Sequence, residues 1–293
     1  MTIAVCYLSP EGVVLGADST TTMFVADKQS GGMTRQFDFA QKVFQIGEMG
    51  NLGVTMWGCG SLGNVSYRTL IARFADEINA TPCAGVDEVA MQFGDLFYRE
   101  YLLEFSQPMT RAQSLASQAA RSIDEEQELQ FYEQNLSGGF CIGGYCLPDR
   151  QPRAFEILYG PLSNAAPVPT EQAISTSRFW GCPNLINRLL FGMDDGVFAA
   201  ILSSPLWTGT PDELFALLNP HSLGQPRNLP IREAIDWVHA SIYSTIKTMK
   251  LSHLAPVCGG PIEVAAITTD RPFRWVRHKE MNAAFSRETA KYV

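Results

Sequence analysis

The first 18 residues constrain the fold of this chain more than any other stretch. Two runs rich in apolar and β-branched residues, 1–8 and 13–18, flank the turn Ser9-Pro10-Glu11-Gly12. Two such runs joined by proline and glycine predict a β-hairpin. Because a hairpin holds the start of its first strand beside the end of its second, we expect the hydroxyl of Thr2 close to the carboxylate of Asp18.

An N-terminal threonine can supply both a nucleophile and its base. Once Met1 is removed, the neutral α-amine of Thr2, with a reference pKa of about 7.7–8.0, can take the hydroxyl proton without any histidine. Methionine before a small residue is usually trimmed in cells, so we expect the free amine to form without a propeptide. The alternative interpretation is that Thr2 is only the first residue of an edge strand.

Composition argues against several other classes of protein. The chain has 293 residues, of which 46% are hydrophobic and 18% charged, and its net charge is −8. This acidic balance argues against nucleic acid or an anionic membrane surface as the main partner. The sequence shows no signal peptide, and no run approaches the roughly 18 apolar residues of a membrane span. We therefore expect a cytoplasmic protein.

The spacing of cysteine and histidine gives no sign of a metal site. The seven cysteines form no CxxC pair, and the four histidines show neither HExxH nor a paired spacing. This pattern is typical of reduced, buried thiols and of ordinary core or surface histidines. We expect no metal and no cofactor.

Hydrophobic periodicity predicts strands first, then helices, then the same order again. The expected strands after the hairpin are 35–39, 42–46, 52–57, 138–146, 153–159 and 261–268. The expected helices are 64–78, one that follows Pro82 and ends before Pro108, 184–191 and 231–249. Residues near 107–135 and 192–230 show little period and are expected to be insertions, and the polar stretch 110–136 has a solvated helix as its alternative interpretation. The order predicts an α+β fold, a four-layer αββα sandwich, in one domain spanning 1–293.

Four motifs in order resemble the proteasome β-subunit branch of the N-terminal nucleophile (Ntn) hydrolases, including its ring-forming bacterial relatives. The matching segments are Thr2 with Gly16-Ala17-Asp18-Ser19, Lys42-Val43-Phe44-Gln45-Ile46, Gly58-Cys59-Gly60-Ser61 and Gly259-Gly260-Pro261-Ile262-Glu263-Val264. The resemblance implies a threonine-type peptidase or amidohydrolase whose catalytic residues are Thr2, Asp18, Lys42 and Gly60. Thr2 would be the nucleophile, and the N–H of Gly60 would form the oxyanion hole.

The same resemblance implies how substrate binds. A peptide or unfolded polypeptide would lie extended along Thr20, Thr21 and Thr22 as an added strand. The pocket for the residue before the cut would be lined by Thr21, Ala40, Phe44, Gly58 and Leu62. The chain would assemble as a homo-oligomer, a ring or a helical stack, and an ATPase partner is an open question.

Departures from the family pattern lie at its supporting residues. Where the family has Ser, Asp and Ser, this chain has Cys182, Ala255 and Cys258, and His253 is a candidate to fill part of that gap. A thiol is a weaker hydrogen-bond donor than a hydroxyl, and alanine offers neither charge nor acceptor. One alternative is therefore a noncatalytic proteasome-like shell subunit, in which Lys42 forms an ordinary surface ion pair.

A second alternative comes from another enzyme class. Gly58-x-Gly60-x-x-Gly63, between a predicted strand and a predicted helix, also fits the dinucleotide-binding fingerprint of an oxidoreductase. That fingerprint belongs to the first βαβ unit of its fold. Here several strands precede it with no helix between them, which favours the hydrolase.

Overall fold

The computed structural model describes residues 2–25, 33–63, 65–253 and 255–279. Its strands form two five-stranded sheets and one two-stranded sheet, and every strand pair is antiparallel. Together with the helices, these antiparallel sheets make an α+β fold.

The first sheet has the order β10-β1-β2-β11-β12. Its strands are β1 (Ile3–Ser9), β2 (Gly12–Ala17), β10 (Thr176–Gly181), β11 (Glu263–Thr268) and β12 (Arg271–Arg277). The predicted N-terminal hairpin is therefore present, with Ala4 opposite Ala17 and Ser9 opposite Gly12. Every residue of β1, β2 and β11 is buried, because both faces of this sheet are covered.

Alternation along β1 divides its side chains between two cores. Ile3, Val5 and Tyr7 pack with the apolar face of helix α7 (Ile231–Leu251). Ala4 and Cys6 point the other way and pack with residues of the second sheet. A strand buried on both faces reads as a continuous apolar run, as the sequence of β1 does.

The second sheet has the order β5-β6-β7-β8-β9. Its strands are β5 (Val43–Ile46), β6 (Leu52–Gly58), β7 (Gly138–Gly144), β8 (Arg153–Tyr159) and β9 (Thr170–Glu171). Helices α1 (Tyr67–Ala80) and α2 (Val86–Ala116) cover its outer face around a core rich in aromatic rings, including Phe93, Phe97 and Phe140. Helix α3 (Ile123–Leu136) packs against the C-terminal part of α2.

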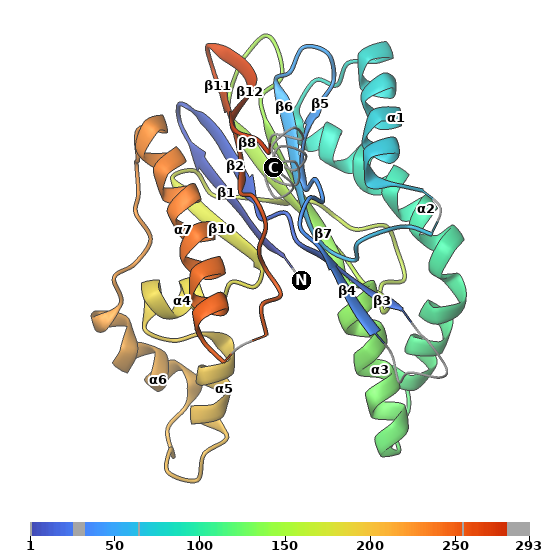
Figure 1. Ribbon diagram of the computed structural model, residues 1–293, viewed down its shortest axis with the longest axis vertical. Helices are drawn as coiled ribbons and strands as arrows, with labels where there is room; N and C mark the ends of the chain where they lie inside the picture. Colours follow the sequence, from blue (N-terminus) through green and yellow to red (C-terminus); the bar gives the residue numbers. More distant parts are fainter. Residues whose placement is uncertain (1, 26–32, 64, 254, 280–293) are drawn as a thin grey trace, which may run out of the picture.

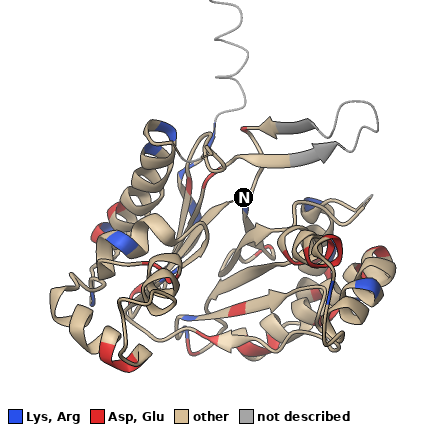
Figure 2. Cartoon of the chain, turned by 90° about the horizontal axis from the view of Figure 1, so that it is seen from below, with Lys and Arg blue, Asp and Glu red and all other residues tan. Residues whose placement is uncertain are grey.

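The two large sheets lie between two groups of helices (Figure 1). Helices α7 and α4 (Asn184–Phe191) lie outside the first sheet, and α1 and α2 lie outside the second. The inner faces of the sheets meet, and there the rings of Trp57 and Trp180 stack with centroids 4.4 Å apart. Basic and acidic residues are interspersed over the helices and loops rather than gathered on one face (Figure 2).

The predicted end of the second helix before Pro108 is wrong, since α2 continues to Ala116. Proline removes one helical hydrogen bond and clashes with the preceding turn. Burial of Met109, Ala112 and Leu115 beyond the proline compensates for that loss, because these side chains pack in the cores beneath α2 and against α3. Tertiary packing thus overrides the local signal.

The two segments predicted as insertions contain regular structure. Residues 107–135 complete α2 and form most of α3, and residues 192–230 contain α5 (Asp195–Leu202), α6 (Pro211–Leu218) and the 3₁₀ helix η1 (Asn219–His221). The pattern also missed β10 and β12. Among the described residues, no helix has the length and apolarity that crossing a membrane requires.

Candidate active site

The site is built around Asp18, which follows directly after β2. Pairing of β1 with β2 places it opposite Ile3, whose N–H donates to Asp18 Oδ1 at 3.1 Å. The backbone N–H of Asp18 donates in return to the carbonyl of Ile3 at 3.1 Å. Thr2, which precedes Ile3, is 4% exposed and Asp18 is fully buried. The hairpin therefore brings Thr2 and Asp18 together at its open end.

Lys42 pairs with Asp18 inside the protein. Its Nζ lies 2.7 Å from Asp18 Oδ1 and donates to the carbonyl of Thr20 at 2.5 Å. The other oxygen, Asp18 Oδ2, accepts the N–H groups of Thr20 and Gly259 at 3.2 and 3.0 Å. The Lys42 side chain is only 6% exposed. A buried ion pair is stable only when the other hydrogen-bonding atoms of both partners also find partners. Here Asp18 Oδ2 and Lys42 Nζ both do.

Glu263, in the strand next to β2, supports the backbone of Lys42. Its side chain is fully buried, and Oε2 accepts the N–H of Lys42 at 3.3 Å. Its Oε1 forms an ion pair with Lys279 Nζ at 3.2 Å and lies 2.9 Å from His278 Nδ1. Lys279 also donates to the carbonyl of Ala40 at 2.7 Å. Burial lowers the pKa of Lys279, while the facing carboxylate opposes that shift.

Sequence reasoning missed the roles of Glu263 and Lys279, although one signal was present. Glu263 is the single charged residue of β11, and a charge in a buried strand requires a partner. The partner lies beyond β12, which the pattern did not predict. In the site as a whole, the carboxylates of Asp18 and Glu263 face the ammonium groups of Lys42 and Lys279, so their charges balance.

Two cysteines lie beside Thr2. Gly181 is paired with Ile3 across the edge of the sheet, and Cys182 follows it. Cys182 and Cys258 belong to one buried cluster, and Cys182 interacts there with the Cys258 thiol and with the backbone of Thr2. That thiol contact lowers the pKa of Cys182 and raises the pKa of Cys258. Both side chains are buried.

The remaining supporting residues do not reach this cluster. Ala255 is exposed. His253 is also exposed, two residues beyond the end of α7, and within the described ranges no hydrogen bond or ion pair joins it to Thr2, Asp18 or Lys42.

The predicted substrate strand is β3 (Thr21–Val25), which pairs with β4 (Met33–Phe37) in the two-stranded sheet. Thr21 lies opposite Phe37, and Thr22 opposite Gln36. The second edge of β3 has no strand partner in the part of the chain that the structure describes. Thr20, just before β3, donates from its hydroxyl to Asp38 Oδ1 at 2.9 Å.

Gly60 lies close to the start of β3. A Cβ added to Gly60 would come within 3.3 Å of Thr21 Oγ1. Gly58, at the end of β6, is exposed, whereas Phe44 and Leu62 are buried in the aromatic core beneath α1. Ala40 is half-buried and bonds through its N–H to the carbonyl of Ser19. Of the predicted substrate residues, the two large apolar ones, Phe44 and Leu62, therefore belong mainly to the core.

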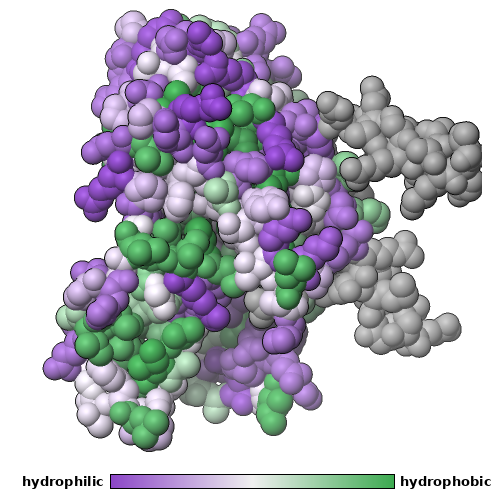
Figure 3. Space-filling model, turned by 60° about the vertical axis from the view of Figure 1, so that its left-hand side comes forward, coloured by the Kyte–Doolittle hydropathy of each residue, from purple (hydrophilic) through white to green (hydrophobic). Residues whose placement is uncertain are grey.

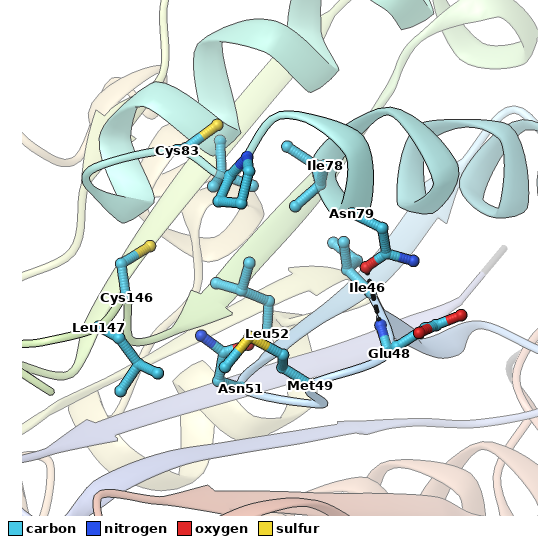
Figure 4. Close-up of a pocket in the computed structure, with 13 residues that line it drawn as sticks. Ile46, Glu48, Met49, Asn51, Leu52, Ile78, Asn79, Cys83, Cys146 and Leu147 are labelled. Atoms are coloured by element: carbon cyan, nitrogen blue, oxygen red, sulfur yellow. Dashed lines mark hydrogen bonds between the residues drawn. The ribbon is translucent and has the colours of Figure 1, made fainter.

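A pocket of about 480 Å³ opens next to this cluster, between α7 and the segment 256–262. Thr20, Asp38 and Cys258 contribute to its wall. A separate pocket of about 230 Å³ lies where the start of α2 meets the turn between β5 and β6, and Cys83 and Cys146 face it (Figure 4). None of the predicted site residues lines that second pocket.

The glycine fingerprint does not lie in the structural context that a dinucleotide site needs. Strand β6 runs antiparallel to both of its neighbours, so it belongs to no parallel βαβ unit. Helix α1 begins only at Tyr67, after an intervening loop. Within the described residues, no group of three or more His, Cys, Asp or Glu side chains is placed to hold a metal ion.

Comparison with known proteins adds little to this geometry. No family model matches the chain, and no curated protein matches it. Among solved structures, the chain is similar to the Anbu (Gly-1) mutant from Hyphomicrobium sp. strain MC1, with 13% sequence identity and a TM-score of 0.49. That alignment covers 100% of this chain and 96% of the other.

Proposed function

We propose that this chain is a proteasome-like N-terminal threonine hydrolase that cleaves peptide bonds in the cytoplasm. Its single domain would be a four-layer αββα sandwich. The observation that carries the proposal is the buried Lys42–Asp18 pair at the end of the hairpin that begins with Thr2. A lysine in an ordinary surface ion pair would be exposed to solvent. Lys42 is buried instead, and its Nζ also donates to the carbonyl of Thr20.

The proposed reaction begins after removal of Met1, a residue outside the described part of the chain. The backbone nitrogen of Thr2 then becomes an α-amine. This amine takes the proton from Thr2 Oγ1 as the oxygen attacks the substrate carbonyl, and the ammonium returns it to the leaving amine. Water then hydrolyses the threonine ester. The positive charge of Lys42 favours the neutral amine and the developing alkoxide.

The surrounding groups would stabilise that reaction. The N–H of Gly60 would donate to the tetrahedral oxyanion, as a preorganised backbone donor. An extended polypeptide would pair with the free edge of β3. Cys182, which interacts with the backbone of Thr2, would remain next to the new amine.

Covalent labelling tests the nucleophile. Protein whose intact mass shows loss of Met1 should react with a β-lactone or an epoxyketone, and peptide mapping should place the adduct on Thr2. Thr2→Ser should still react, whereas Thr2→Ala should not, because only a hydroxyl can form the adduct. An adduct on cysteine alone, or no adduct at all on protein that lacks Met1, would refute the assignment.

The main alternative is a shell subunit that assembles without chemistry. The presence of Cys182, Ala255 and Cys258 at positions where the family has Ser, Asp and Ser favours it. The labelling experiment separates the two proposals, because a shell subunit would stay unlabelled even with Thr2 at its N-terminus. The intact Thr2, Asp18 and Lys42 favour the hydrolase.

We also propose that the chain forms a homo-oligomer, a ring or a helical stack, that encloses the site. Apolar side chains gather over the lower part of the molecule, around α4, α5 and α6 (Figure 3). The most exposed of them are Leu189, Leu206, Phe215, Leu217 and Leu223. Large exposed apolar patches are typical of interaction surfaces. Light scattering should give a mass well above the 32.3 kDa of one chain, and a monomer mass across micromolar concentrations would contradict this.

A further inference from the structure

Cys182 and Cys258 form a dithiol that links two distant parts of the chain at the nucleophile. Cys182 follows Gly181, which is paired with Ile3. Cys258 precedes Gly259, whose N–H donates to Asp18 and whose carbonyl accepts the N–H of Ser19. The two segments are therefore fixed to opposite sides of the β1–β2 hairpin end, and their thiols meet in one buried cluster.

The other cysteines of the chain differ in access or in acidity. Cys6 and Cys141 also touch, but both are fully buried between the two sheets. Burial raises the pKa of Cys83, and it raises the pKa of Cys146 to about 11. Cys182 alone has a lowered pKa among the cysteines with a resolved shift, chiefly because of its interaction with the Cys258 thiol. The thiolate is the form of cysteine that reacts with oxidants, as the nucleophile.

Small molecules can reach the pair from the side of Cys258, whereas Cys182 lies behind it and does not line the pocket. Cys258 lines the pocket of about 480 Å³ between α7 and the segment 256–262. A water molecule takes about 30 Å³ in the liquid, so hydrogen peroxide can enter a space of this size. Thr20 and Asp38 line the same pocket, which therefore connects to the proposed site.

We propose that Cys182 and Cys258 are a modification site at which a hydroperoxide forms an intramolecular disulfide that reversibly disables Thr2. The formation of the disulfide is independent of the proposed function, and only the loss of Thr2 reactivity rests on it. The disulfide would remove the thiol hydrogen between the two sulfurs. It would also convert Cys182 Sγ, next to Thr2, from a thiolate into a neutral sulfur that is a weaker hydrogen-bond acceptor.

The chemistry takes two steps. The Cys182 thiolate attacks one peroxide oxygen, the O–O bond breaks, and the departing oxygen takes up a proton to leave as water or an alcohol, giving a sulfenic acid. The Cys258 sulfur then loses its proton and attacks Cys182 Sγ, and the displaced hydroxide takes that proton as water. Two thiols and one hydroperoxide thus become one disulfide, one alcohol or water, and one water.

Thiol mapping tests the first part of the proposal, the formation of the disulfide. The full chain would be treated with hydrogen peroxide near one equivalent, free thiols would be alkylated, and peptides would be mapped without reduction. We expect a cross-linked peptide pair containing Cys182 and Cys258, lost on treatment with dithiothreitol, while Cys6 and Cys141 remain thiols. Cys258→Ser should abolish the cross-link, and the control Cys83→Ser should retain it. Independent over-oxidation of the two cysteines, or oxidation of Cys83 while Cys182 stays reduced, would overturn the proposal.

Labelling of Thr2 tests the second part of the proposal, the loss of Thr2 reactivity. The rate of β-lactone labelling should fall at least about tenfold on oxidation and recover with dithiothreitol, because losing a hydrogen bond to a charged group costs more than a factor of ten. A disulfide that leaves the labelling rate unchanged would overturn the inhibitory role. If the reduced protein without Met1 does not label at all, the proposed function fails, and thiol mapping still decides whether the disulfide forms.

Discussion

Lys42→Met should lower the rate of Thr2 labelling and of peptide hydrolysis by at least about 10²-fold, the effect expected when a positioned catalytic group is lost. The change removes the positive charge that lies 2.7 Å from Asp18 while keeping most of the stem volume. It also leaves the Asp18 carboxylate buried and unpaired, which costs about 3–5 kcal/mol of folding free energy. Labelling must therefore be measured at a urea concentration where the variant is folded.

Two further variants separate catalysis from stability. Lys42→Met combined with Asp18→Asn removes both charges, so much of the lost stability should return while labelling stays low. Lys279→Met is the matched control, because this lysine is equally buried and also paired with a fully buried carboxylate, that of Glu263. We expect it to lose similar stability and to keep most of the labelling.

Parent-like labelling in both Lys42 variants would show that the lysine serves only to neutralise Asp18. An equal loss of labelling in Lys279→Met and Lys42→Met would point to the integrity of the whole charge cluster rather than to one ammonium group. Each result is read against the urea midpoint of the same variant, so an unfolded protein is not mistaken for an inactive one.

The parts of the fold that sequence could predict are those with a strong local pattern. The hairpin of β1 and β2 follows from two apolar runs around Pro10 and Gly12, and α7 follows from its apolar stripe. Strand β12 was missed because Arg271, Arg274 and Arg277 make it resemble a solvent-exposed tail, although it pairs with β11 at the sheet edge. Strand β10 was missed for a different reason, because its partner β1 lies far away in sequence and such pairing leaves little trace in either strand alone.

The candidate site likewise has contacts that local sequence patterns predict and contacts that only the complete fold creates. Thr2 and Asp18 are brought together by the shortest possible connection, so local reasoning could place them. Lys42 was placed by its resemblance to the family motif, and the structure then puts its ammonium on Asp18. The contacts of Glu263 with Lys279, and of Cys182 with Cys258, join distant segments, and only the fold brings them together.

Gly181→Ala should both destabilise the protein and displace Thr2. Gly181 has a φ of +80°, and an added Cβ would lie 1.9 Å from the carbonyl oxygen of Thr2, far inside contact distance. The left-handed backbone costs alanine about 1–2 kcal/mol. The clash adds about 1–3 kcal/mol, as overpacking does elsewhere, because the obstructing atom is backbone rather than a flexible side chain. Urea unfolding measures the sum.

Gly192→Ala is the matched control, because Gly192 ends α4 with a similar φ of +74° and has no atom within 4 Å of the added Cβ. It should show the left-handed cost alone and label at the parent rate. In Gly181→Ala, relief of the clash requires β1 and β10 to separate where Ile3 faces Gly181, and this moves Thr2 away from Asp18 and Lys42. Labelling of the folded variant should therefore fall as well. Equal midpoints and equal labelling rates for the two variants would show that the β10 edge does not hold the nucleophile in place.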